Sequence, residues 1–166
     1  QQVERKPSEA TAYLTLALFY ESLERPSDAL ATLDRALAVA PEDERVLTLR
    51  AQYLLAAKPD DPAARKEARG LLDQVLARNP DSVVGLFTEA KLLLHDGRRE
   101  DAPKRLEPVV QTQPSANAHY LLATAYTRMR RDDLARAQLL EALAMDATSP
   151  RIHADLAALY LRTGEA

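Results

Sequence analysis

The segment Asn117–Ala147, NAHYLLATAYTRMRRDDLARAQLLEALAMDA, decides the fold of this chain. Its first half carries apolar and aromatic residues at helical spacing, namely His119, Leu122, Ala123 and Tyr126. Its second half continues that spacing with Ala135, Leu139 and Ala142. Intervals of three and four residues place such side chains on one face of an α-helix. The segment therefore predicts two amphipathic helices joined by a short turn.

Equivalent small residues recur along the whole chain at nearly constant spacing. The middle of each expected first helix carries Ala17, Ala51, Ala90, Ala123 and Ala157, at intervals of 34, 39, 33 and 34 residues. The start of each expected second helix carries Ala29, Ala68, Ala102 and Ala135. Small residues are needed where helices cross at about 8 to 10 Å. The two positions lie 12 residues apart in three repeats and 17 apart in the second, so we assign a five-residue insert to Lys58–Pro62.

This pattern resembles the tetratricopeptide repeat (TPR), a 34-residue helix–turn–helix whose signature includes an aromatic, Leu-Gly, Tyr, Ala and Pro. The usual Gly is Ala in all five copies, and the following aromatic position is Tyr20, Leu54, Leu93, Tyr126 and Tyr160. The resemblance implies an all-α, right-handed α-solenoid of antiparallel helix hairpins with about nine helices. It implies one domain over residues 1–166, with repeats at about 9–41, 43–80, 82–114 and 116–147 and a half repeat at 150–162.

Turn and cap residues predict the helix boundaries. Helices are expected over about 9–23, 28–41, 43–56, 62–78, 82–95, 100–112, 116–130, 132–145 and 150–161. Ser8 is expected to cap the first helix, and Gly97 to end the fifth in a left-handed conformation. Pro108 lies within the sixth helix, where it removes a hydrogen bond to Lys104, so we expect a kink there.

Composition excludes several classes of protein. Over 166 residues the net charge is −3, and Lys and Arg are spread over every expected helix, which argues against nucleic-acid binding. No segment approaches the 18 apolar residues of a membrane span, so no membrane insertion is expected. The absence of cysteine excludes disulfides and fits the cytoplasm or the periplasm of a bacterium equally. Because no initiator Met or signal peptide is present, we expect a piece of a longer protein or a mature form.

The sequence offers little catalytic or metal-binding chemistry. It contains no nucleophile elbow, phosphate loop or HExxH motif, so we expect neither an enzyme nor a cofactor. His119 and His153 lie one repeat apart in an aromatic position, which favours packed or hydrogen-bonded rings over a metal site. Arg50 and Glu89 both replace Leu in the first-helix pattern. They could pair with each other across stacked helices, or each could extend alone to water.

The resemblance also implies where a partner would bind, because first helices line the concave groove of a TPR array. On this register the candidate partner-binding residues are Arg45, Thr48, Gln52, Phe87, Lys91, Asn117, Tyr120, Thr124, Arg128, Arg151 and Asp155. Phe87 and Tyr120 occupy equivalent positions one repeat apart and are expected to act as paired anchors. The alternative is that these are ordinary exposed residues. Leu14 and Leu18 replace the Lys and Asn with which some family members hold a chaperone tail, so that clamp is absent.

We therefore expect a non-catalytic protein-interaction scaffold that binds a peptide or helical segment of another protein. One alternative is self-assembly into a homo-oligomer through the C-terminal helix, where Ile152, Leu156 or Leu159 should be partly uncovered. The other is an accessory region of a larger envelope-assembly, secretion or polysaccharide-export protein. No metal and no cofactor enter any of these hypotheses.

Overall fold

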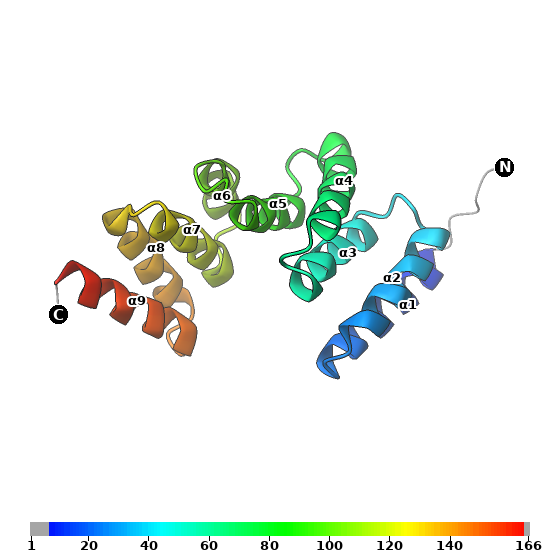
Figure 1. The fold of residues 1–166 in the computed structure, drawn as a ribbon, viewed down its shortest axis with the longest axis horizontal. Coiled ribbons are helices and arrows are strands. Elements are labelled where there is room, and N and C mark those ends of the chain that lie inside the picture. The colour runs from blue at the N-terminus through cyan, green and yellow to red at the C-terminus, as the bar shows by residue number, and fades with distance from the viewer. Residues whose placement is uncertain (1–6, 165–166) are drawn as a thin grey trace. The chain divides into compact units, whose positions relative to one another are not determined.

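The computed structural model describes residues 7–164, and in this part of the chain every regular element is an α-helix (Figure 1). The helices are α1 Pro7–Ser22, α2 Pro26–Val39, α3 Glu44–Ala57, α4 Pro62–Arg78, α5 Val83–His95, α6 Asp101–Thr112, α7 Ala116–Arg128, α8 Asp132–Met145 and α9 Pro150–Thr163. Residues 1–88 form one compact unit and residues 89–166 a second, so the boundary falls inside α5. Most of the expected helix ends are confirmed to within two residues.

Local chemistry explains where the helices begin and end. Asp43, Asp61 and Ser115 each accept a hydrogen bond from a backbone N–H in the first turn of the following helix. At the end of α5, Gly97 has φ 74°, and the Arg98 and Gly97 N–H groups donate to the Leu93 and Leu94 carbonyls, which closes a Schellman motif. The expected Gly97 cap is confirmed. Helix α1 begins at Pro7, and the Ser8 side chain expected to cap it lies outside the described part of the chain.

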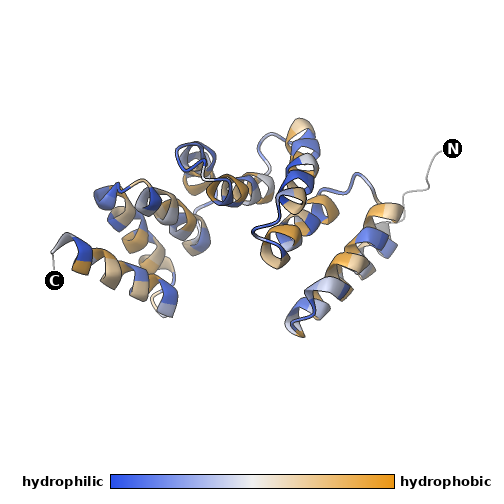
Figure 2. Ribbon diagram, in the orientation of Figure 1, coloured by the Kyte–Doolittle hydropathy of each residue, from blue (hydrophilic) through white to orange (hydrophobic). Residues whose placement is uncertain are grey.

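Both series of small residues, except Ala157 on α9, are buried in the structure. Ala17, Ala51, Ala90 and Ala123 are almost fully buried, as are Ala29, Ala68, Ala102 and Ala135. In the first unit Ala17 and Ala29 join Leu33, Val46 and Tyr53 in one core. Figure 2 colours the ribbon by hydropathy and shows that hydrophobic and hydrophilic residues are interspersed along each helix. The alanines that recur along the sequence in repeats one to four are therefore the residues buried between the helices.

The C-terminal helix α9 departs from expectation. Ile152, Leu156 and Leu159 are only 3%, 8% and 3% exposed, so the prediction that one of them is uncovered is wrong. Helix α9 packs on α8, and these three residues form its buried stripe. The uncovered side instead carries Leu161, which is 76% exposed, and Ala157, whose four equivalents in the earlier repeats are buried.

The charges of Arg50 and Glu89 have partners on second helices. Arg50 lies 2.6 Å from Asp34 on α2 and 2.5 Å from Glu67 on α4. Glu89 Oε2 lies 2.8 Å from Arg105 Nε on α6, although the pair does not have hydrogen-bond geometry. Neither expectation for these residues is met, because each charge is paired within its own unit and neither extends alone to water.

Candidate partner-binding surface

In the first unit, three of the predicted residues are already held by neighbours on or beside α3. The Arg45 guanidinium binds the Asp43 carboxylate at 2.7 Å, which lowers the pKa of Asp43 and raises that of Arg45. Thr48 is only 3% exposed, and its hydroxyl donates to the Glu44 carbonyl at 2.6 Å. Gln52 Nε2 donates to the Thr88 hydroxyl at 3.0 Å. We leave Thr48 out of the proposed site because a partner cannot reach it.

Phe87 and Tyr120 are both half-buried. Phe87 belongs to the first unit and Tyr120 to the second. Their predicted pairing as two anchors of one ligand therefore stays a prediction, and each residue is considered within its own unit.

The second unit gathers several predicted residues around Tyr120 on α7. The Tyr120 hydroxyl donates to Asp155 Oδ2 at 2.6 Å, and the Arg151 guanidinium lies 4.3 Å from the centre of the Tyr120 ring. Arg151 and Asp155 lie one turn apart on α9, so the two helices are joined through the aromatic ring. Desolvation and the nearby Asp155 carboxylate raise the pKa of Tyr120. Tyr120 therefore stays a neutral donor whose ring also binds a cation.

Lys91 on α5 adds positive charge near this group. The residue is exposed as a whole, yet partial desolvation of the ammonium group lowers its pKa, and the charge of Arg151 lowers it further. Two cations thus lie close enough to repel one another. A negatively charged ligand at this surface would relieve that repulsion.

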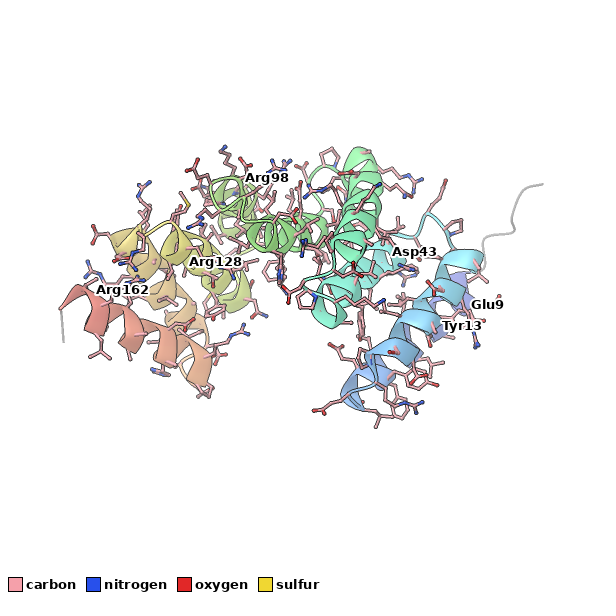
Figure 3. All side chains as sticks on the ribbon, viewed as in Figure 1. Glu9, Tyr13, Asp43, Arg98, Arg128 and Arg162 are labelled. Carbon is pink, nitrogen blue, oxygen red and sulfur yellow. The ribbon has the colours of Figure 1, made fainter. Side chains whose placement is uncertain are left out.

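A cavity of about 210 Å³ lies between α7 and α9 and is lined by Ala123, Thr124, Thr127, Arg128, Leu139, Asp155, Ala158, Leu159 and Arg162. Arg128 donates from Nη1 to the Leu94 carbonyl at 2.8 Å. Arg162 binds Asp132 on α8 at 2.6 Å. Figure 3 labels both arginines, Arg128 on α7 and Arg162 on α9. Asn117 is exposed at the start of α7.

Three of the predicted residues, Thr124, Arg128 and Asp155, line the cavity, whereas the lining residues Thr127, Leu139, Ala158 and Arg162 were not among the predicted ones. Ala158 and Arg162 follow Asp155 by three and seven residues, which is the spacing of one helix face. That signal was available in the sequence. Leu139 on α8 could not be assigned in this way, because it comes from a second helix.

His119 and His153 make hydrogen bonds within the fold. Buried His119 places Nδ1 2.8 Å from Gln138 Oε1 on α8, which confirms its reading as a hydrogen-bonded ring between helices. His153 places Nε2 2.8 Å from the Ala147 carbonyl oxygen. Among residues 7–164 no three His, Cys, Asp or Glu side chains are arranged to hold a metal ion.

None of the helices in residues 7–164 combines the length and the apolar character needed to cross a membrane.

Helix hairpins repeated around small-residue contacts define a helical-repeat protein of the α-solenoid class, which binds other proteins on the surfaces of its stacked helices. The chain belongs to the tetratricopeptide repeat family. A tetratricopeptide repeat model matches residues 1–53 and 64–125, and a second model of that description matches residues 116–149. The gap between 53 and 64 contains the predicted Lys58–Pro62 insert. The fold class predicted from the sequence, an all-α solenoid of helix hairpins, is confirmed.

Solved structures of bacterial proteins share the fold. A thermophilic TPR protein of Thermus thermophilus is 25% identical with a TM-score of 0.81, over 93% of this chain and 83% of the other. MamA from Desulfovibrio magneticus is 23% identical with a TM-score of 0.72, over 94% and 86%. PilF of Pseudomonas aeruginosa is 19% identical with a TM-score of 0.81, over 96% and 71%. No curated protein sequence matches this chain.

Proposed function

We propose that the chain is a non-catalytic scaffold that binds a peptide or helical segment of another protein on its first helices. The observation that carries this proposal is the group formed by Tyr120, Arg151 and Asp155 beside the cavity between α7 and α9. An aromatic ring with polar and charged neighbours is typical of the few residues that dominate binding energy at protein interfaces. Family membership supports the same class of function.

The experiment uses a phage library of random 12-residue peptides selected on the immobilised protein. Tyr120→Ala should weaken selected peptides by about tenfold or more, because truncating an aromatic anchor commonly costs about 2 kcal/mol. Leu140→Ala is the control, since Leu140 is exposed on α8 and does not line the cavity. It should change affinity less than about twofold. Fluorescence anisotropy gives the affinities, and thermal melts check that both variants fold.

Phe87→Ala tests the first unit in the same way. Phe87→Ala should weaken by about tenfold the selected peptides that bind the first unit. Equal affinity of the wild type, Tyr120→Ala and Leu140→Ala proteins would contradict the proposal and move recognition to second helices or to the Lys58–Pro62 insert.

A second candidate function is self-assembly, which exposed apolar residues favour. On α1, Leu16 is 38% and Phe19 55% exposed, and Leu161 lies bare on α9. Sedimentation at several concentrations separates the two functions. A monomer that binds selected peptides supports the scaffold, whereas association that Leu161→Gln or Phe19→Gln abolishes supports self-assembly. The same surfaces would serve an accessory region within a larger protein.

A further inference from the structure

The cavity between α7 and α9 has the size and lining of a receptor for one apolar side chain. Its volume is about 210 Å³, below the roughly 300 to 1,000 Å³ of typical small-molecule sites. The nonpolar lining comes from three helices, as Ala123 on α7, Leu139 on α8 and Ala158 and Leu159 on α9. Apolar surface removed from water here would contribute binding free energy in proportion to its area.

Most of the charged groups at the cavity are positive. Arg128 and Arg162 line it, and Arg151 lies one turn before Asp155 on α9. The only carboxylate in the lining is Asp155, which already accepts the Tyr120 hydroxyl. The chain as a whole carries a net charge of −3, so this positive surface is a local feature.

The guanidinium groups of these arginines have N–H donors beyond those used in the contacts described. Arg128 uses one nitrogen on the neutral Leu94 carbonyl, and Arg151 lies on an aromatic ring. Arg162 uses one nitrogen on Asp132. A guanidinium group has five N–H donors in a planar fork that fits a carboxylate in two parallel hydrogen bonds. Each arginine can therefore bind a further carboxylate without leaving its present neighbour.

We propose that this cavity receives one apolar side chain of an acidic segment of a partner protein, while carboxylates flanking that side chain bind Arg128 and Arg151. The inference rests on the proposed function and names the chemistry of its ligand. Charge complementarity selects an acidic partner, and the size of the cavity selects a single apolar anchor.

The test uses the random 12-residue library described above. Selected peptides should carry Leu, Ile, Met or Phe flanked by at least two Asp or Glu residues. Ala158→Leu fills the cavity and should weaken these peptides by about tenfold or more. Ala157→Leu makes the same change on the adjacent exposed residue, outside the cavity, and should leave affinity within about twofold.

A second pair of variants tests the charge. Arg151→Gln should weaken binding by about fivefold or more and flatten its salt dependence, because one charge pair is lost. Arg130→Gln removes the same charge from an exposed residue in the turn after α7, so it controls for net charge and should have little effect. This pair keeps the proposal testable should Ala158→Leu lower the stability of the fold.

Three results would overturn the inference. The selected peptides could be neutral or basic, they could bind Ala158→Leu and Ala157→Leu proteins equally, or they could match a segment of this chain and indicate a second copy. If such peptides still lose affinity with Tyr120→Ala, the scaffold function stands and only the ligand class is wrong. If no peptide is selected, or none responds to any variant, both proposals fail.

Discussion

Two buried tyrosines join helices in the same way in different repeats. Tyr53 on α3 donates to Glu21 Oε2 near the end of α1, and Tyr126 on α7 donates to Glu107 Oε1 on α6, each at 2.7 Å. In both cases desolvation is the largest cause of a raised tyrosine pKa, and the glutamate raises it further. The pKa of Tyr126 reaches about 12.

Tyr126→Phe should therefore change how stability depends on alkaline pH. The pKa of Tyr126 in the folded protein is about 12, above the ordinary value of 10.0. The neutral Tyr126 hydroxyl therefore stabilises the folded state fully below pH 10, and this stabilisation is lost as the pH rises through 12. The variant should lose about 1 kcal/mol near pH 8, for the missing hydrogen bond, and should show a shallower decline above pH 10. Urea unfolding across this range measures both effects. If the unfolding free energies of the wild type and Tyr126→Phe ran parallel from pH 8 to pH 12, Tyr126 would not be the group that titrates with a raised pKa.

Two glycines in helices should respond to alanine with opposite signs. A Cβ on Gly85 would lie 3.0 Å from the Ser82 hydroxyl and 3.1 Å from Leu76 Cδ2. Ser82 cannot move easily, because it accepts from the Gly85 N–H and donates to Glu44. Gly85→Ala should destabilise the protein by about 1 kcal/mol. Gly70 has nothing within 4 Å, so Gly70→Ala should stabilise it by about 0.5 to 1 kcal/mol. Chemical denaturation measures both, and equal signs would contradict the packing argument.

At this scale the sequence predicted small residues better than polar partners. The alanine positions were found because close helix crossing permits only small side chains there. The partners of Arg50 and Glu89 were not found, because long side chains reach several neighbours and the sequence does not specify their rotamers. The same limit applies to the site, where Tyr120 was predicted but its bond to Asp155 and its contact with Arg151 were not.

At the scale of elements, α6 contains Pro108 in its interior, and proline is the residue least favourable to a helix there. The helix continues through Pro108 to Thr112, whose hydroxyl donates to the Pro108 carbonyl at 2.9 Å. The kink expected near Lys104 stays a prediction. Pro108 is exposed, so its replacement does not remove a core side chain.

Pro108→Ala should stabilise the protein, because it restores an N–H that can bond to the Lys104 carbonyl. The gain should be at most about 3 kcal/mol, the cost of proline within a straight helix, and smaller if a bend already relieves the clash. Thermal unfolding measures the gain. Pro103→Ala is the comparison: Pro103 lies in the first turn, where no such bond is lost, and it is buried, so this variant should lower stability. A loss of stability with Pro108→Ala would show that neighbouring helices depend on the proline geometry.

The error in α9 also belongs to this scale. The periodicity correctly placed Ile152, Leu156 and Leu159 on one face of a helix, but it does not say against which neighbour that face packs. The face turns back toward α8, and the small residue Ala157 faces the uncovered side. Periodicity predicts which residues are buried together, whereas topology decides where.

At the scale of the whole molecule, the chain consists of two compact units, and repeat proteins are stabilised mainly by contacts between neighbours. Their fold was predictable because the same residue pattern recurs along nearly the whole chain. The single domain inferred from the sequence stays a prediction. The boundary within α5 was not predictable, because nothing in the repeat pattern distinguishes that helix from the other first helices.

Truncating a core side chain should therefore increase local unfolding mainly in the unit that contains it. Leu33→Ala in the first unit and Leu106→Ala in the second each remove a fully buried side chain, at a cost of about 2 to 5 kcal/mol. Hydrogen exchange should rise mainly in α1 to α3 for Leu33→Ala and mainly in α6 to α8 for Leu106→Ala. The two variants serve as controls for each other. A uniform rise in both would show that the units unfold as one.

Arg50 has a consequence for how the first unit responds to force. Its side chain is only 13% exposed and binds carboxylates of two successive second helices, whereas Asp34 and Glu67 are about half exposed. The guanidinium is therefore a fixed tether, and its two attachments are open to screening by salt. Pulling the first two repeats apart must break one attachment while the other still holds. The ionic part of the resistance of the first unit to mechanical stretching should therefore fall as the salt concentration rises.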